Sequence, residues 1–209
     1  MRAPSGRDRA YTFVKKEILT DPDRQGTFIN EQVVADQIGV SRTPIREALL
    51  MLAAQDLVQL VPQRGAYIAP MSNRELRDLV GVRLMIEQHA VHSLTDFQNT
   101  VYEMQEFLAA QNLLRRTVQA KEFIELDMRF HTALVRAAGN EMLTKLYEGL
   151  RDRQATAGMV ALSRSPGRQE EVLAEHAAIL NALTSVDVPA ALTAIEKHLA
   201  STLRVQLSA

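Results

Sequence analysis

The 209-residue sequence contains no cysteine and no tryptophan, and aromatic residues make up only 5% of it. The lack of cysteine excludes disulfides, thiolate metal sites and cysteine nucleophiles, and it agrees with a reducing cytoplasm. No apolar run approaches the length needed to span a membrane, and no leader with a charged start and an apolar core opens the chain. The sequence therefore predicts a soluble, cytoplasmic protein without a membrane partner.

The chain also lacks an excess of either charge, since its formal net charge is -1. Residues 1–71 hold nine lysines and arginines against eight aspartates and glutamates. Overall charge therefore gives no support for nucleic-acid binding, and any DNA contact has to come from the local placement of basic residues. A hydrophobic content of 46% supports real cores, and the length suits one large domain or two small ones.

A stretch around residue 40 carries the signals of two helices joined by a tight turn. Asn30 predicts the cap of a first helix, which Gly39 ends in a left-handed conformation. A second helix follows, with Ser41 as its expected cap and Pro44 in its first turn. The polar residues near its start are Arg42, Thr43 and Arg46. An ordinary amphipathic helix is the alternative, but the pair of helices favours a helix-turn-helix whose second helix reads DNA.

Two short segments with strand composition follow directly. Residues 57–61 and 66–69 are mostly apolar, and a turn at residues 62–65 separates them, which predicts a β-hairpin. A purely structural hairpin is the alternative. After a helix-turn-helix, however, the hairpin is better interpreted as a wing whose tip residues contact the DNA backbone or minor groove. These tip residues are Gln63, Arg64 and Gly65.

The domain boundary is expected near residue 70, which gives a winged helix-turn-helix domain over residues 1–70 and a second domain over residues 71–209. Ser72 and Glu75 form a capping box at the start of the second domain. Six helices are expected there, over residues 72–94, 99–118, 120–138, 141–162, 167–183 and 188–206. Their short connections predict an antiparallel six-helix bundle, so the fold class is mainly α.

Four polar residues lie on helix faces that are otherwise apolar. Asp127 and His131 are four residues apart and therefore project from one face, while His176 and His198 fall on the apolar stripes of two later helices. A single core histidine is usually a structural residue. Burying all four unpaired would be costly, so together they predict a site for a divalent transition metal. Zn²⁺ is the expected ion, with Ni²⁺ or Mn²⁺ as alternatives, because Ca²⁺ prefers oxygen donors.

Arg83 lies on the apolar stripe of the first bundle helix, and Glu87 follows one turn later. One interpretation is a buried ion pair within the helix. The other is that Arg83 holds the carboxylate of an anionic ligand, which could complete the shell of a metal with open coordination positions. Both interpretations remain open at this point.

The order of these parts resembles the GntR superfamily of bacterial transcription regulators, in the branch with a FadR-type C-terminal (FCD) domain. Residues 34–49 carry the family's helix-turn-helix signature. Arg42, Thr43 and Arg46 fall on its operator-contacting positions, and Gly65 falls on its wing-tip glycine. The six expected bundle helices resemble the VanR-like subgroup rather than the seven-helix FadR type.

The resemblance extends to the second domain. The four candidate metal ligands fall on the FCD metal-site pattern, and Arg83 and Glu87 match an arginine and a glutamate four residues apart in the first FCD helix. The family implies that a small carboxylate binds beside the metal, with Arg83 and Glu87 as effector-binding residues.

The expected function is that of a metabolite-responsive repressor, not an enzyme, which binds a pseudo-palindromic DNA operator as a homodimer. A metal-dependent hydrolase or oxygenase built on the Asp/His₃ site is the alternative. The chain has no His-Glu-x-x-His motif, and four protein ligands exceed the three of most catalytic zinc sites. A non-specific architectural DNA-binding protein is disfavoured by the near-neutral first domain, because such proteins depend on phosphate neutralisation.

Overall fold

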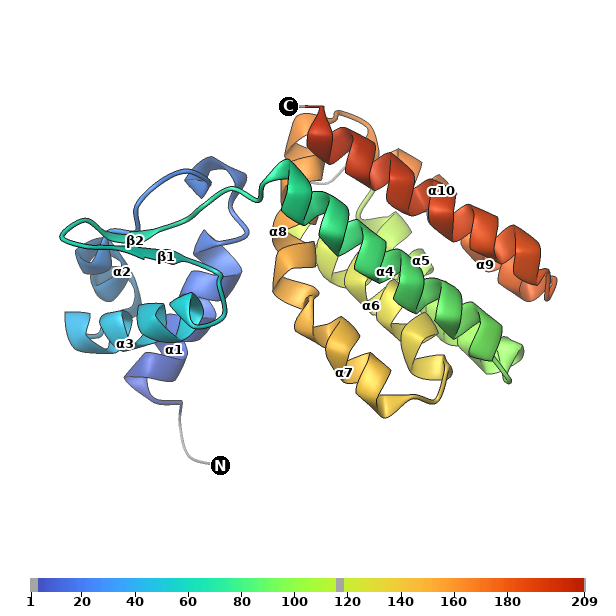
Figure 1. Cartoon of the computed structure of the whole chain (residues 1–209), viewed down its shortest axis with the longest axis horizontal. Helices are drawn as coiled ribbons and strands as arrows, with labels where there is room; N and C mark the ends of the chain where they lie inside the picture. The colour runs from blue at the N-terminus through green and yellow to red at the C-terminus, as the bar shows by residue number, and fades with distance from the viewer. Residues whose placement is uncertain (1–3, 116–118, 209) are drawn as a thin grey trace. The chain divides into compact units, whose positions relative to one another are not determined.

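The computed structural model describes residues 4–115 and 119–208. They fall into two compact units, which divide between Met71 and Ser72 (Figure 1). Within the described residues, no helix combines the length and the apolar character needed to cross a lipid bilayer.

The first unit is a winged helix-turn-helix. Its elements in chain order are α1 (Gly6–Phe13), a π-helical turn (Val14–Ile18), a 3₁₀ turn (Pro22–Arg24), α2 (Glu31–Ile38), α3 (Arg42–Ala53), β1 (Gln59–Val61) and β2 (Gly65–Tyr67). Apolar side chains from all three helices and from the hairpin region form one core, which includes Ala10, Val34, Ile45, Leu49 and Ile68. This core fixes the angle between α2 and α3, and so it sets which side of α3 faces solvent.

The turn between α2 and α3 follows the sequence signals with one exception. The Asn30 side chain accepts hydrogen bonds from the amides of Gln32 and Val33, and Gly39 ends α2 at a φ of 67°. Ser41 precedes α3 in an extended conformation, but its side chain makes no capping hydrogen bond to any described residue, so the expected Ser41 cap is wrong. A cap accepts from the second or third amide of the helix, and Pro44 stands third and has no N–H.

The hairpin is antiparallel and shorter than expected. Gln59 pairs with Tyr67 and Val61 with Gly65, so residues 62–64 form its tip. A third segment adds an isolated bridge between Phe28 and Tyr67. Gly65 adopts a φ of 98°, a conformation that favours glycine because it has no Cβ.

The second unit is an all-helical bundle. Its helices are α4 (Asn73–Ser93), α5 (Phe97–Leu113), α6 (Ala120–Ala137), α7 (Glu141–Gly149), α8 (Arg151–Arg164), α9 (Arg168–Thr184) and α10 (Val188–Leu207). Ser72 and Glu75 form the expected capping box in front of α4. The expected end of the second helix at residue 118 lies outside the described residues, and α5 itself ends at Leu113.

The helix expected over residues 141–162 is two helices, α7 and α8, with a break at Leu150. The Leu150 amide bonds the carbonyl of Tyr147, three residues back rather than four, and the preceding Gly149 is a weak helix former. The described part of the bundle therefore has seven helices where six were expected. Helix number consequently gives no support to the VanR-like subgroup.

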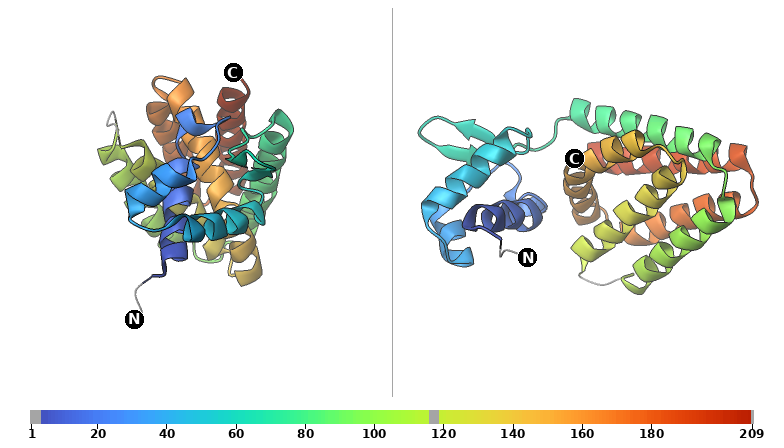
Figure 2. Two further views of the ribbon diagram at one scale, coloured as in Figure 1. Left: turned by 90° about the vertical axis from the view of Figure 1, so that its left-hand side faces the viewer. Right: turned by 90° about the horizontal axis from the view of Figure 1, so that it is seen from below.

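Helix α6 lies at the centre of the bundle, where it packs against α4, α5, α7 and α8 (Figures 1 and 2). Helix α10 lies alongside α4 and α9. The inward faces are mostly apolar, with Phe130, Leu134, Ile179 and Ile195 fully buried. The same faces of α4, α6, α9 and α10 carry charged and histidine side chains, which meet inside the bundle.

Candidate metal centre and DNA-reading surface

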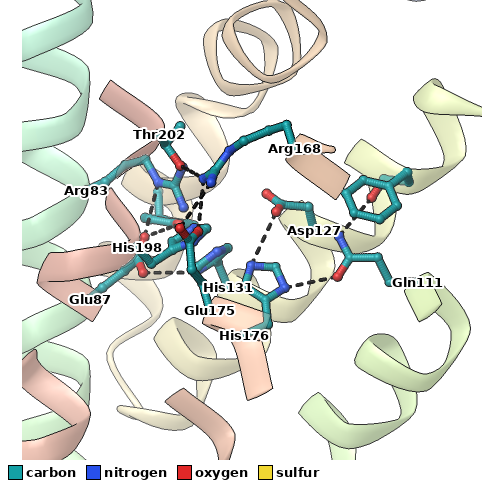
Figure 3. A network of polar contacts seen from close by, with 12 residues as sticks. Arg83, Glu87, Gln111, Asp127, His131, Arg168, Glu175, His176, His198 and Thr202 are labelled. Carbon is teal, nitrogen blue, oxygen red and sulfur yellow. Dashed lines mark hydrogen bonds and ion pairs between the residues drawn. The ribbon is translucent and has the colours of Figure 1, made fainter. Parts of the chain in front are cut away.

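Four side chains from three helices converge inside the bundle (Figure 3). Asp127 and His131 come from α6, His176 from α9 and His198 from α10, and one ligand atom from each lies within 4.8 Å of the others. All three histidines are buried, with at most 2% of each residue exposed. The structure thus brings together all four residues that the sequence singled out as metal ligands.

Each of the three histidines is held through its Nδ1 atom by an oxygen acceptor. The pairs are His131 with Glu87 (2.9 Å), His176 with Gln111 (2.9 Å) and His198 with Glu175 (2.8 Å). A neutral imidazole that donates from Nδ1 carries its lone pair on Nε2. The Nε2 atoms of His131 and His176 are buried and find no hydrogen-bond partner among the described residues. Such lone pairs beside a carboxylate fit a bound divalent cation.

The electrostatics keep Asp127, His176 and His198 in the forms that bind metals. Burial lowers the pKa of His176 to about 3, against the opposing effect of Asp127, so the ring is neutral at physiological pH. Burial likewise lowers the pKa of His198. Burial alone would raise the pKa of Asp127. The contact with His176 and the nearby histidines have the larger, opposite effect and lower this pKa below its ordinary value, so the side chain is a carboxylate. Its Oδ1 lies 3.3 Å from His176 Nε2, outside hydrogen-bond alignment.

An arginine donates hydrogen bonds to each of the two glutamates that contact histidines. Arg83 Nε donates to Glu87 Oε1 at 3.1 Å, and the Tyr147 hydroxyl donates to the same oxygen at 2.7 Å. Arg168 donates to both oxygens of Glu175, at 3.0 and 2.9 Å. Burial acts to raise the pKa of Glu175, but the hydrogen bonds from His198 and Arg168 outweigh it and hold this pKa at about 2. These contacts fix the orientation of the imidazole rings.

A cavity of about 40 Å³ adjoins the centre, with Asp127 and His198 in its wall. Arg83 also lines it, and its buried Nη2 has no partner among the residues that the structure describes. The ion pair with Glu87 therefore exists, yet it leaves one donor of Arg83 available at the cavity. Glu87, expected as an effector-binding residue, is absent from the cavity wall as far as it is described, and it lies behind Arg83 and His131.

The polar residues at the start of α3 lie on the surface of the first unit. Thr43 is exposed, and the side chains of Arg42 and Arg46 are 52% and 60% exposed. Both arginines share one carboxylate oxygen: Glu31 Oε2 accepts from Arg42 Nη2 at 2.9 Å and from Arg46 Nε at 2.8 Å. Because two cations flank it, Glu31 has a lowered pKa, although its partial burial acts in the opposite direction.

The wing tip is fixed by an aromatic contact. The guanidinium of Arg64 lies over the Phe28 ring, 4.5 Å from its centroid, and the Phe28 ring lies 5.1 Å from that of Tyr67. Gln63 is exposed and has a φ of 62°, so the tip turns sharply on either side of Arg64. All six predicted DNA-contacting residues thus belong to one unit, at the start of α3 or at the wing tip.

Sequence reasoning missed the residues that support these sites, which are Glu31, Gln111, Tyr147, Arg168 and Glu175 in their observed roles. Three of them left a signal. Gln111 continues the spacing of Met104 and Leu108, so it is a polar residue on an inward stripe. Arg168 and Glu175 are seven apart in α9, which places them on one helix face.

Comparison with known proteins places the chain in a family. The model of the bacterial regulatory proteins of the gntR family matches residues 7–68, and the FCD domain model matches residues 78–201. The chain therefore belongs to the GntR family of bacterial transcription regulators and carries an FCD domain. GntR regulators bind DNA and are typically dimeric. The family and its relatives are transcription regulators, as predicted, and not enzymes.

Individual relatives agree with this assignment. The chain is 30% identical over 196 residues to an HTH-type transcriptional regulator from an unstable DNA locus of Streptomyces ambofaciens, covering 90% of this chain and 80% of the relative. It is 29% identical over 194 residues to the HTH-type transcriptional repressor RspR of Escherichia coli K12, with coverage of 90% and 83%. A GntR regulator structure from Rhodococcus sp. RHA1 superposes with a TM-score of 0.81 at 20% identity, covering 99% of both chains, which supports the fold.

Proposed function

We propose that this regulator is a metabolite-responsive repressor, which binds a pseudo-palindromic operator as a homodimer and holds a divalent metal, Zn²⁺ by preference, in each bundle. A small carboxylate beside the metal is its effector. The observation that carries this proposal is the unpartnered Nη2 of Arg83, buried at a cavity whose wall also contains two of the four converging metal-ligand residues.

The DNA contacts follow from the exposed ends of α3 and the hairpin. With α3 in the major groove, Arg42, Thr43 and Arg46 would reach bases and phosphates. Gln63, Arg64 and Gly65 would lie at the adjacent backbone or minor groove. Glu31 holds the two α3 arginines side by side before DNA arrives, which lowers the entropy that they lose on binding.

The metal would be held by Asp127, His131, His176 and His198. This donor set of three imidazoles and one carboxylate suits Zn²⁺, Ni²⁺ or Mn²⁺ better than Ca²⁺. The bound ion would supply a Lewis acid for one oxygen of the effector carboxylate. Arg83 would donate from Nη2 to the same carboxylate, while Glu87 acts as a positioning residue that keeps Arg83 and His131 in place.

Regulation would follow from thermodynamic coupling between the two sites. If the effector binds the DNA-free protein more tightly than the DNA-bound protein, it weakens operator binding, and operator DNA weakens effector binding by the same factor. The two affinities should therefore change by equal factors, which a titration with either the effector or the operator DNA can measure.

The test begins with a binding site selected from random DNA by the full-length, Zn²⁺-loaded protein. Fluorescence anisotropy should show binding to this site at least about 1,000-fold tighter than to a shuffled duplex, because specific operator binding typically exceeds non-specific binding by that factor or more. Equal affinity for both duplexes across a range of salt concentrations would refute the regulator mechanism. Analytical ultracentrifugation of the complex should show two chains per duplex.

A further inference from the structure

Phe28 is an aromatic residue beside the wing that has no part in the DNA contacts proposed so far. It lies on the segment 26–29, which runs antiparallel to residues 66–68 and is joined to them by main-chain hydrogen bonds of 2.8 and 2.9 Å. These bonds flank Phe28 and Tyr67 without joining them, and opposite side chains lie closest in pairs of this kind. The two ring centroids are 5.1 Å apart, so the Phe28 ring is held in place against the hairpin.

Arg64 is the only charged residue within residues 57–71, and it lies at the wing tip. Its guanidinium is 4.5 Å from the centroid of the Phe28 ring. Among the residues that the structure describes, no carboxylate pairs with the exposed Arg64 side chain. A ring attracts a cation without neutralising its charge. Arg64 is therefore positioned and keeps its full charge, whereas the two arginines of α3 share a glutamate.

A fixed guanidinium at the tip of a hairpin suits the minor groove of DNA. This groove is about 6 Å wide in B-DNA, and it is narrower in A-tracts, where its negative potential is strongest. A guanidinium fits such a groove because it is flat and more weakly hydrated than an ammonium group. The contact with the ring also reduces the side-chain entropy that Arg64 loses on insertion. A contact to phosphate alone would carry no direct information about sequence.

We propose that Arg64 enters the minor groove beside each half-site and selects narrow, A·T-rich sequence there, with Phe28 as the positioning residue for its guanidinium. This role rests on the proposed function, in which the winged domain binds an operator. It extends recognition to base pairs that α3 does not contact, where the protein distinguishes duplexes by groove shape. Without the ring, Arg64 would sample more rotamers, and contacts to phosphates would replace much of the groove contact.

The first step of the test locates the base pairs under the wing. Hydroxyl-radical footprinting on the operator selected from random DNA compares the unmodified protein with Arg64→Ala, and the wing positions are those whose protection disappears in the variant. Three duplexes then carry A·T, G·C or inosine·C pairs at these positions only. Inosine lacks the amino group that guanine presents in the minor groove, but it presents the same groups in the major groove.

The second step measures affinity by fluorescence anisotropy with the full-length, Zn²⁺-loaded protein. The A·T and inosine·C duplexes should bind at least about fivefold more tightly than the G·C duplex, because one unfavourable base pair typically costs a factor of this size or more. A reader of the major groove would instead treat inosine·C as G·C. The comparison therefore separates recognition in the two grooves.

Variants assign this preference to the ring. Phe28→Leu keeps an apolar side chain and removes the aromatic face, so it should reduce the preference for A·T to less than about twofold. Phe28→Tyr retains the ring and should keep the preference of the unmodified protein. Tyr11→Leu is the matched control, because it removes the contact between Lys15 and the Tyr11 ring in the same unit but outside the wing. Circular dichroism at the assay temperature checks that each variant is folded.

Arg64→Lys tests the same preference without altering the ring. Lysine keeps the positive charge, so affinity for the G·C duplex should change by less than about threefold, while the preference for A·T should fall because an ammonium group is more strongly hydrated. This variant keeps the test decisive even if Phe28→Leu does not fold, because the Arg64 side chain is exposed.

The possible failures separate the levels of the argument. Equal affinities for the A·T and G·C duplexes, or a footprint that Arg64→Ala leaves unchanged, would overturn the minor-groove role of Arg64. Binding of inosine·C as weakly as G·C would place the preference in the major groove and overturn the same role. A preference that survives in a folded Phe28→Leu variant would overturn the positioning role of Phe28. Equal binding of the selected operator and a shuffled duplex would overturn the proposed function itself.

Discussion

Arginine–glutamate contacts occur in both units of the molecule, but in opposite surroundings. In the first unit, Arg42 and Arg46 share Glu31 while 52% and 60% of their side chains remain exposed. In the bundle, Arg83 and Arg168 are 8% and 1% exposed, and each is held by a buried or half-buried glutamate. The same chemical pair is therefore hydrated in one unit and enclosed in the other.

The difference in hydration decides what each pair can do. An exposed ion pair contributes about 0–1 kcal/mol, so DNA phosphates can replace Glu31 at little cost. Removing one partner of an enclosed pair costs about 3–5 kcal/mol, because a charge remains buried without compensation. The exposed pair suits a contact that is exchanged during function, whereas the enclosed pairs suit a fixed scaffold for the histidines.

The largest effect is expected for Glu87→Ala. This change leaves Arg83, His131 and Tyr147 without their common acceptor, so the bundle should lose about 3–5 kcal/mol of unfolding free energy. Urea denaturation of the metal-free, full-length protein measures this loss. Glu103→Ala is the control, since Glu103 pairs with Arg136 on the surface of the same bundle and should cost less than about 1 kcal/mol. Equal losses would contradict the distinction between enclosed and exposed pairs.

The next largest effect is expected when the metal is removed. A ligand present at about 1,000 times its dissociation constant stabilises the folded state by roughly 4 kcal/mol. Adding a chelator to Zn²⁺-loaded protein should therefore lower the melting temperature by about 8–16 °C, at about 2–4 °C per kcal/mol for a protein of this size. Differential scanning calorimetry tests this, and hydrogen exchange should localise the loss of protection to α6, α9 and α10. An unchanged melting temperature would show that the four ligands hold no stabilising metal.

Gln111→Leu tests one of the hydrogen bonds that hold the imidazole rings of the candidate metal centre. Gln111 touches no candidate ligand other than His176 among the hydrogen bonds of the described residues, so its loss frees one ring without removing a ligand. Changes of this kind typically reduce metal affinity about 10–100-fold. Competition with a chromogenic chelator measures the affinity. A Gln111→Glu variant should restore much of it, because a carboxylate also accepts from Nδ1; failure of this rescue would point to a packing role for Gln111.

The hydrogen bonds that hold the imidazole rings also show what the sequence could not predict. The inward direction of Asp127, His131, His176 and His198 follows from helical periodicity, which needs only the residues of one helix. Gln111 and His176, by contrast, are 65 residues apart, and Glu87 and His131 are 44 apart. No local pattern states which helices are neighbours, so the ligands could be predicted while most of their supporting partners could not.

The fold shows the same division between local and non-local information. The αL turn at Gly39 and the capping box of Ser72 and Glu75 depend on adjacent residues, and the sequence indicated them correctly. The break at Leu150 is one residue long and contains no proline, so its local signal was too weak to divide one helix into two. At Ser41, Pro44 removes one of the two amides that a cap could accept from, so the sequence itself already weakened the expected cap.

In the first unit, Arg46→Ala should affect operator binding much more than the stability of the fold. Loss of one base contact costs about 1–3 kcal/mol, or roughly 5–150-fold in operator affinity. The unfolding free energy should change by less than about 1 kcal/mol, since the pair with Glu31 is exposed. Arg24→Ala is the control, because Arg24 is equally exposed in the same unit but lies outside α3 and the wing. Anisotropy and urea denaturation on the same samples separate the two effects, and a loss of affinity as large for Arg24→Ala would refute the assignment to α3.

The smallest effect is expected for Glu31→Gln, which removes the carboxylate that Arg42 and Arg46 share. Affinity for random DNA should rise by no more than about fivefold, because the exposed pairs that DNA must break are worth at most about 1 kcal/mol. Operator affinity should rise less, since the two arginines lose the contact that holds them side by side, and the ratio of specific to random binding should therefore fall. Asp23→Asn removes one negative charge from the same unit without touching the arginines. If it raises random binding and lowers the ratio as much as Glu31→Gln does, net charge rather than arginine placement explains the effect.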